Sequence, residues 1–270
     1  MKQKETFVKE FYNNRKLIWT LAKNDFKTKY AGSYLGKIWA FIQPVVTTLV
    51  YWFVFQIGLR AGQDMEYPYI LWLMAGLIPW FYFSESLNGG TAAMLDYSYL
   101  VKKVVFNIRI LPVVKVISAL FVHVFFVGIL FVLAWAYGYH PDVYSLQLLY
   151  YMICSFLLVM GLSYLSSAVV CFFRDLSQVI NILLQIGIWV TPIMWDAEKT
   201  LSAISPVLVT VFKLNPVYYI VQGFRNAVIL KQWFWEDAWW TIYFWVFTIA
   251  MLWIGTAVFK RLKVHFADVL

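Results

Sequence analysis

The chain is poor in charged residues. Asp, Glu, Lys and Arg make up only 13% of its 270 residues, whereas hydrophobic residues make up 62%. A soluble domain of ordinary composition carries charge at about one residue in four, so this composition excludes such a domain. The charges are also unevenly placed, because six long stretches contain none. These stretches are 38–59, 67–84, 116–139, 143–173, 176–195 and 238–259.

Each uncharged stretch is long enough to cross the bilayer core, which is about 30 Å thick. Inside a bilayer the backbone must satisfy its own hydrogen bonds. Helices do so at these lengths, whereas the strands of a membrane barrel have only about 10 residues. The sequence therefore predicts an all-α integral membrane protein with six transmembrane helices. We expect one six-helix transmembrane domain over 38–259, between a cytoplasmic amphipathic interfacial segment (1–37) and a cytoplasmic tail (260–270).

Cysteine and histidine are also scarce, with two Cys and three His in the chain. Cys154 and Cys171 fall in one predicted helix, about 25 Å apart along its axis, which is beyond the reach of a disulfide. His123 is the one His inside a predicted crossing, and no Asp, Glu or Cys stands beside it at metal-ligand spacing. The sequence therefore predicts no metal site, and we interpret His123 as a partner in a hydrogen bond between helices.

The positive charges lie mostly on one side of the predicted membrane. The segments assigned to the cytoplasmic side carry 17 Lys or Arg, and those assigned to the outer side carry five, together with seven acids. The positive-inside rule then puts both termini in the cytoplasm, as an even number of crossings requires. The net charge of +8 is explained by this topology and by contact with anionic lipid, so nucleic acid is not an expected partner.

The segment before the first crossing has apolar residues near helical spacing with lysines between them. We predict an amphipathic helix in the cytoplasmic interface, whose apolar face lies among the acyl chains, packs on a partner, or does both. Lys16, Lys23 and Lys27 would lie beside the apolar stripe, where lipid phosphates are found. The glycines of 32–37 would form a bend before the first crossing, because this stretch lacks the spacing and the Ser or Thr of a P-loop.

Two predicted loops are long, and they lie on opposite sides. The inner loop, 88–112, contains the apolar run 99–106, which faces the cytoplasm and is too short to cross. The outer loop, 196–237, contains two apolar runs that are also too short and that flank Asn215-Pro216. Proline removes a helical donor and restricts the residue before it, so we expect re-entrant helices with a turn at this pair.

Two charged residues stand close to or inside apolar runs. Glu85, near the cytoplasmic end of the second crossing, would snorkel to the headgroups or meet Lys102 or Lys103. Arg225, in the second apolar run of the outer loop, would bind a phosphate or carboxylate in a wet exit path or snorkel at the outer headgroups.

Three stretches of the sequence are similar to type-2 ABC exporter permeases for cell-surface polysaccharides. They resemble, in order, the entry to the first helix, the coupling helix of the inner loop and the outer-loop segment before the last helix. The stretches are 25–36 running into Trp39 and Gln43-Pro44, 100–106 closed by Leu111-Pro112, and 214–219 followed by Arg225. Within that family, 51–55 and 72–76 look closest to the permeases of wall teichoic acid export.

The resemblance implies a non-catalytic transport subunit in the cytoplasmic membrane of a bacterium. The chain would form a homodimer and pair with two copies of a separate ABC ATPase, which would bind ATP and Mg²⁺, so that this chain itself needs no cofactor. The implied cargo is an undecaprenyl-diphosphate-linked glycopolymer, with wall teichoic acid first and O-antigen or capsular polysaccharide as the alternative. A small-molecule ABC-2 exporter and an integral membrane transferase remain open, although a transferase should show clustered acids or a His with a carboxylate partner.

The residues and the resemblance together give a candidate site. Aromatic residues make up 20% of the chain; many would form interfacial belts, and a minority facing a pathway would stack on sugar faces. Coupling to the ATPase is assigned to Tyr99, Leu100, Val101, Lys102, Lys103, Val105 and Phe106. The substrate pathway and its gate are assigned to Lys16, Lys23, Lys27, Tyr51, Trp52, Phe55, Glu85, Asn215, Pro216, Tyr218 and Arg225.

Overall fold

The computed structural model describes residues 7–63, 65–102, 106–202 and 204–269, and every regular element in these ranges is helical, as the sequence predicts. The long helices are α2 (Trp39–Trp52, continued by a π-helical segment Phe53–Gly58), α3 (Tyr69–Asp96), α5 (Ile110–Ala136), α6 (Gln147–Val170), α7 (Leu176–Val190) and α11 (Ala238–Leu262). The others are α1 (Phe7–Lys29), α4 (Ser98–Val101), α8 (Ala197–Ser202), α9 (Pro206–Lys213), α10 (Pro216–Arg225, continued by a π-helical segment Asn226–Leu230) and α12 (Phe266–Val269).

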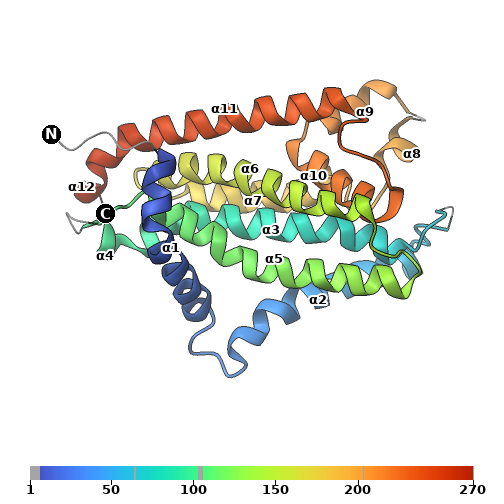
Figure 1. The fold of residues 1–270 in the computed structure, drawn as a ribbon, viewed down its shortest axis with the longest axis horizontal. Coiled ribbons are helices and arrows are strands. Elements are labelled where there is room, and N and C mark those ends of the chain that lie inside the picture. The colour runs from blue at the N-terminus through green and yellow to red at the C-terminus, as the bar shows by residue number, and fades with distance from the viewer. Residues whose placement is uncertain (1–6, 64, 103–105, 203, 270) are drawn as a thin grey trace.

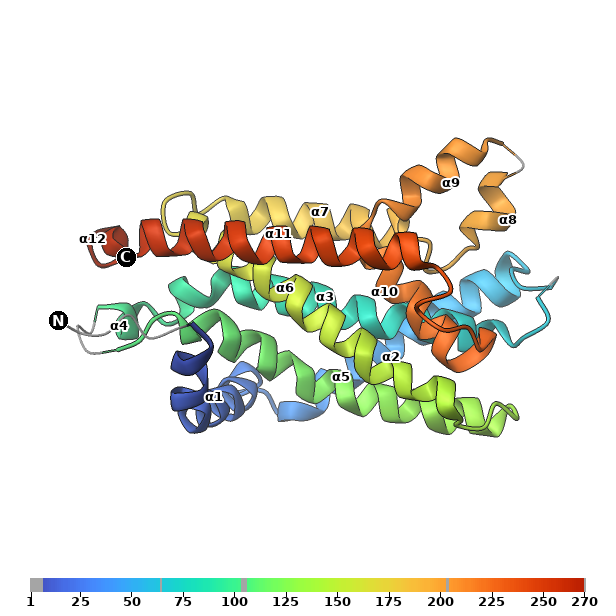
Figure 2. The same ribbon diagram turned by 45° about the horizontal axis from the view of Figure 1, so that its top comes forward.

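The long helices form one elongated bundle (Figure 1). α4 and α12 lie at one end of it, and α1 lies across the bundle near that end. α8 and α9 lie at the opposite end, as the turned view in Figure 2 also shows. The inner-loop helix and the outer-loop helices therefore occupy opposite ends, which is the arrangement that a multi-pass membrane protein requires.

Five helical stretches in the described residues are long and apolar enough to cross a membrane, and a sixth is present if the bent pair α9 and α10 counts as one span. The predicted fifth crossing, 176–195, is shorter than expected, because α7 ends at Val190. Thr191 precedes a proline and is extended, with ψ at 120°. Steric conflict with the proline ring disfavours helical backbone at such a residue, so the helix stops there.

α3 is the centre of the bundle. Its membrane-length window is 72% buried, against 11% for the stretch that contains α2 and 22% for the one that contains α11. α3 packs against α5, α6, α7 and α10, so it has almost no face turned away from protein. All-round burial explains why the sequence of α3 is apolar on every side, whereas α2 and α11 keep broad faces for lipid or for another chain.

α3 is also longer than the predicted second crossing. It continues to Asp96, so residues 88–96 of the predicted inner loop are helical. Its small residues face α6: a Cβ on Gly90 would lie 2.2 Å from Oγ of Ser163, and Oγ1 of Thr91 lies 2.8 Å from Oγ of Ser166. The Gly and Thr residues that suggest a loop are therefore a surface for close helix packing.

α11 is fixed to α6 by a pair of glycines. A Cβ on Gly255 would lie 2.2 Å from the carbonyl oxygen of Gly161, and a Cβ on Gly161 would lie 2.7 Å from the backbone nitrogen of Leu252. Two membrane helices can approach this closely only where neither carries a side chain.

The chain turns sharply between α1 and α2. Gly32 and Gly36 have φ of 90° and 53°, in the left-handed region that favours glycine. The predicted bend before the first crossing is therefore confirmed, and it lets α1 lie across the bundle while α2 runs along it (Figure 1).

Candidate functional site

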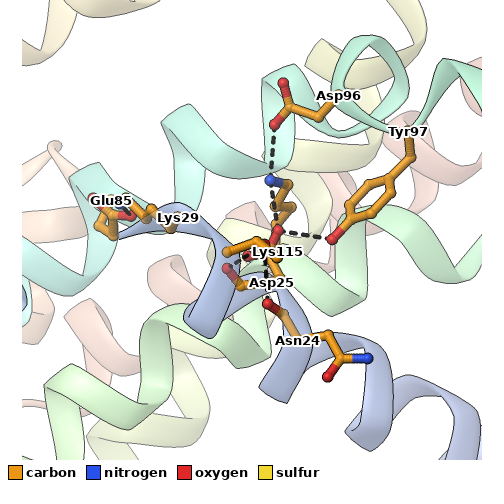
Figure 3. Close-up of polar contacts among 8 residues, drawn as sticks. Asn24, Asp25, Lys29, Glu85, Asp96, Tyr97 and Lys115 are labelled. Carbon is orange, nitrogen blue, oxygen red and sulfur yellow. Dashed lines mark hydrogen bonds and ion pairs between the residues drawn. The ribbon is translucent and has the colours of Figure 1, made fainter. Parts of the chain in front are cut away.

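A network of charged side chains fastens α1 to the bundle at the α4 end (Figure 3). Asp25 on α1 is only 7% exposed. Its Oδ1 accepts a hydrogen bond of 2.8 Å from the hydroxyl of Tyr97 and lies 2.7 Å from Nζ of Lys115 on α5. The same ammonium lies 2.8 Å from Oδ2 of Asp96, at the end of α3. One lysine thus links carboxylates from two helices, and α1, α3 and α5 meet at one point.

The network is shielded from water on the α1 side. Burial, together with the adjacent Asp25 carboxylate, raises the pKa of Tyr97, so its hydroxyl remains protonated and can donate. The side chains of Lys115 and Asp25 are 14% and 9% exposed. Removing one partner from such a shielded pair leaves the other charge without compensation, which costs more than the loss of a surface ion pair.

A second ion pair joins α1 to α3 about one turn further along α1. Lys29 pairs with Glu85, and both side chains are about half exposed. Burial acts to lower the pKa of Lys29, but the Glu85 carboxylate outweighs this effect and the pKa is raised. The predicted contact of Glu85 with Lys102 is wrong, since about 16 Å of helix separates Glu85 from the end of α3. Lys103, the other predicted contact, lies outside the described residues.

Two cavities meet at this second ion pair. The larger, of about 490 Å³, has the charged residues Asp25, Asp96 and Lys115 in its wall. The smaller, of about 240 Å³, lies between α1, α2, α3 and α5. Lys29 and Glu85 line both cavities, so the ion pair stands between the cavity that Asp96 and Lys115 line and the cavity between α1, α2, α3 and α5.

The predicted lysines of α1 point away from the bundle. Lys16, Lys23 and Lys27 are exposed, whereas Ile18 and Ala22 are buried against the core. α1 packs on α5 of the same chain, so part of its apolar face is covered within the protein. Contact of α1 with acyl chains or with a partner stays a prediction. A role for the three lysines in guiding a lipid phosphate stays a prediction.

The predicted coupling segment begins with the single-turn helix α4. Tyr99 and Lys102 are exposed, Val101 is buried, and Leu100 and Phe106 are partly buried. The predicted coupling residues Lys103 and Val105 lie outside the described residues. α4 follows Tyr97 directly, so the segment predicted to meet the ATPase is adjacent in the chain to a residue that bonds to α1.

The predicted outer turn is present between α9 and α10, which are bent by 96°. Asn215 caps α10: its side-chain oxygen accepts from the Val217 nitrogen at 3.0 Å, and its amide donates to Thr191 Oγ1 at 2.8 Å. Pro216 takes the first position of α10, where its missing N–H costs nothing. Tyr218 is buried beneath α8. A gating role for these three predicted residues stays a prediction.

Arg225 is inside the protein, with 1% of its side chain exposed. Its Nη2 donates to the carbonyl oxygen of Ile193 at 2.7 Å, and its guanidinium carbon lies 3.6 Å from the centroid of the Trp72 ring. The non-helical stretch after α7, which contains Ile193, is also held by a hydrogen bond of 2.7 Å from the Tyr69 hydroxyl to the Met194 carbonyl oxygen. In this conformation Arg225 therefore fastens the end of α7 to α10 and α3, and its assignment to the exit path stays a prediction.

The predicted aromatic residues of α2 lie toward α7. Tyr51 and Phe55 each have ring centroids 6.4 Å from Trp189, and Trp52 is partly buried against the core. None of the three is fully enclosed. They border the broad exposed face of α2, and whether they line a pathway stays a prediction.

Sequence reasoning missed the residues that hold α1 in place. Asp25, Lys29, Asp96 and Lys115 are absent from the predicted site. One signal was available: Asp25 follows Ile18 and Ala22 at helical spacing on the buried face of α1. An acid on an apolar stripe needs a partner, because burial of an unpaired charge is costly.

A bundle of membrane-length helices, crossed at one end by a fastened amphipathic helix, defines an integral membrane protein. Comparison with known families agrees: residues 16–229 match the family described as ABC-2 type transporter. The match covers most of the chain, which therefore belongs to the ABC-2 type transporter family.

The chain is also similar along nearly its whole length to curated permeases. It is 27% identical over 261 residues to the O-antigen export system permease protein RfbA of Myxococcus xanthus, covering 97% of this chain and 98% of that protein. It is 24% identical over 259 residues to a protein of the same name from Klebsiella pneumoniae, covering 94% and 95%. These relatives are named for O-antigen export. The resemblance of stretches 51–55 and 72–76 instead placed wall teichoic acid first among the expected cargoes.

Proposed function

We propose that this chain is the permease subunit of an ATP-driven exporter that carries a lipid-linked polysaccharide of the O-antigen class from the cytoplasm to the cell surface. The carrier lipid is undecaprenyl diphosphate. The chain acts in a bacterial cytoplasmic membrane with both termini inside. It works as a homodimer with two copies of a separate ABC ATPase, which binds the ATP and Mg²⁺.

One observation carries this proposal: the similarity to O-antigen export permeases extends over 94–97% of this chain. It reverses the order of substrates that the sequence suggested. Wall teichoic acid becomes the second candidate, because it rests only on stretches 51–55 and 72–76. No described feature favours a small-molecule cargo or a transferase.

The described geometry supports a division of tasks along the bundle. At the α4 end, Tyr99 and Lys102 are exposed for contact with an ATPase. Next to them, the Asp25 network joins α1 to α3 and α5, so a force on α4 reaches α1 through a short path. At the other end, the bent pair α9 and α10 lies where a polymer would leave.

The route itself is assigned to the surface between two copies of the chain. The window that contains α2 is only 11% buried within one chain, and its exposed face is apolar and bordered by Tyr51 and Phe55. Two such faces would form a conduit. Its aromatic rings would pack against the apolar faces of sugars, while the polar edges of the sugars would remain free to form hydrogen bonds.

Reconstitution tests the function and the cargo together. The permease and its ATPase would be placed in proteoliposomes and supplied with undecaprenyl-diphosphate-linked O-polysaccharide or with undecaprenyl-diphosphate-linked teichoic acid. We expect ATP-dependent transfer of the O-polysaccharide across the membrane and a rise in ATPase turnover. Transfer of teichoic acid alone would make that polymer the cargo, and transfer of neither would contradict the proposed function.

The three exposed lysines of α1 give a second test in the same assay. Each adds about 1 kcal/mol of attraction to an anionic surface. Replacement of Lys16, Lys23 and Lys27 by Gln should therefore raise the concentration of lipid-linked substrate needed for half-maximal flux. A change in protein yield alone would limit these lysines to anchoring the helix.

A further inference from the structure

The smaller of the two cavities offers a mainly apolar surface. Its volume is about 240 Å³, and α1, α3 and α5 each contribute a phenylalanine to its lining: Phe26, Phe81 and Phe126. His123 and Tyr82 also border it, but they are only 3% and 2% exposed, and their polar groups interact with Ile78 and Ser86. These two side chains therefore add little polar surface, and the cavity suits the hydrocarbon part of a ligand.

The larger cavity, of about 490 Å³, presents charge instead. The described residues that line it include three carboxylates and two ammonium groups: Asp25, Glu85, Asp96, Lys29 and Lys115. Lys115 lies between Asp25 and Asp96, 2.7 and 2.8 Å from their oxygens, so this group of three has one net negative charge. Lys29 and Glu85 pair with each other and are neutral together. A ligand with net negative charge is therefore disfavoured in this cavity, whereas a neutral or positively charged group is not.

The ion pair of Lys29 and Glu85 lies where the two cavities meet, because both side chains line both of them. Both side chains are about half exposed, so a ligand can reach them. A molecule that occupies both cavities would have its apolar part in the smaller one and its charged part at the ion pair. An amphipathic molecule has this shape, and phospholipids are the amphipathic molecules that surround a membrane protein.

The two charges of the pair determine which headgroup fits. A zwitterionic headgroup inserted between Lys29 and Glu85 leaves neither charge without a partner, because its phosphate meets the Lys29 ammonium and its ammonium meets the Glu85 carboxylate. A headgroup that carries only a phosphate would leave Glu85 unpaired beside another anion, which is unfavourable. The diphosphate of a carrier lipid has still more negative charge and is a poorer match. Among zwitterionic headgroups, ethanolamine has an ammonium that donates hydrogen bonds, whereas the methylated ammonium of choline does not.

We propose that the two cavities together bind one phosphatidylethanolamine molecule of the surrounding bilayer, with its phosphate at Lys29, its ammonium at Glu85 and the start of one acyl chain in the smaller cavity. That cavity holds about eight methylene groups, if each takes about 30 Å³, the share of a water molecule in the liquid. The direct ion pair is the lipid-free form of this site. The bound lipid joins α1 to α3 in its place, and the site is independent of the identity of the cargo.

Binding of two lipids that differ only in the headgroup tests this assignment. The delipidated complex of permease and ATPase would be titrated with dioleoyl phosphatidylethanolamine and with dioleoyl phosphatidylglycerol, and bound lipid would be counted by native mass spectrometry. We expect phosphatidylethanolamine to bind about tenfold more tightly, as one additional charged hydrogen bond allows. Glu85→Gln should remove most of this difference, and Lys29→Gln should weaken the binding of both lipids. Gln43→Trp, at an exposed position in the wall of the smaller cavity, should also weaken both, because the ring fills the space of the acyl chain.

Glu198→Gln is the matched control, because it breaks the ion pair of Glu198 with Lys213, and neither residue lines either cavity. It should leave the tenfold difference unchanged. Equal binding of the two lipids to the wild type, no binding of either, or a difference that Glu85→Gln retains would overturn the assignment. Tighter binding of undecaprenyl diphosphate than of phosphatidylethanolamine would also overturn it, since the site would then belong to the carrier. Unchanged binding to Gln43→Trp would overturn the placement of the acyl chain. Glu85→Gln changes one atom of a half-exposed side chain, so the variant is expected to fold.

Discussion

Asp25 on α1 and Lys115 on α5 hold a carboxylate oxygen and an ammonium nitrogen 2.7 Å apart, largely shielded from water. This contact fixes the position of the amphipathic helix on the bundle. The contact is linked directly to α4, because the hydroxyl of Tyr97 donates to the same oxygen of Asp25 and Tyr97 is the N-cap residue of α4.

Asp25→Asn should lower the free energy of unfolding by about 3 kcal/mol, the lower end of the range for breaking a shielded ion pair, because Lys115 loses one of its two carboxylates. Denaturation of the purified permease in detergent measures this. Asp175→Asn is the control, since Asp175 is exposed and should give a change within about 0.5 kcal/mol. Equal effects of the two substitutions would show that the network does not stabilise the fold.

Gly255→Ala should destabilise the protein by about 2 kcal/mol, because the added carbon would lie 2.2 Å from the Gly161 carbonyl oxygen and α11 must move away from α6. Gly128→Ala on α5 is the matched control, with no atom within 4 Å of the added carbon. It should be neutral or slightly stabilising, since Ala favours helix over Gly. Thermal unfolding of both variants separates the two outcomes, and a harmless Gly255→Ala would contradict the close contact.

Tyr99→Asp combined with Lys102→Glu should release the partner ATPase from the permease, because it puts two negative charges on the exposed surface of the predicted coupling segment. The ratio of ATPase to permease after affinity purification is expected to fall roughly tenfold, equivalent to about 1.4 kcal/mol. Lys260→Glu, an exposed charge reversal near the end of α11, serves as the control. Undiminished copurification of the double variant would place ATPase coupling elsewhere.

Single cysteines along 207–229 should show two patterns of accessibility to an impermeant thiol reagent added from outside. Val207 and Val211 are exposed on α9, whereas Val221 and Phe224 of α10 are buried. The background would replace Cys154 and Cys171, both buried. Labelling on α9, protection on α10 and a change of pattern when ATP is trapped are expected of a gate. Uniform labelling that ignores nucleotide would indicate a solvated loop.

Much of the helical architecture could be predicted because the bilayer imposes it. A segment without charge and about 20 residues long has few alternatives to a helix. The end of α7 at Val190 also has a signal in the sequence, since Thr191 precedes a proline, but the prediction of this crossing used only the absence of charge. The extension of α3 to Asp96 was hidden, because Gly89 and Gly90 suggest a loop until the approach of α6 gives Gly90 a packing role.

The candidate site was harder to predict, because it depends on how α1 lies on the bundle. Helical spacing shows which face of α1 is buried, but it does not show that this face meets α5, so the pairing of Asp25 with Lys115 could not be inferred. The same holds for Glu85, whose partner Lys29 arrives only because Gly32 and Gly36 turn the chain back.

The uninterrupted length of α3 has a mechanical consequence. Twenty-eight residues of helix extend about 42 Å, more than the thickness of the bilayer core, and the far end carries α4. A tilt of about 10° around a pivot at the Arg225 end would displace α4 by about 7 Å, as follows from that length. Because α3 is one continuous helix, a small rotation among the tightly packed residues near Trp72 would become a large displacement of α4, and a displacement of α4 would become a small rotation near Trp72.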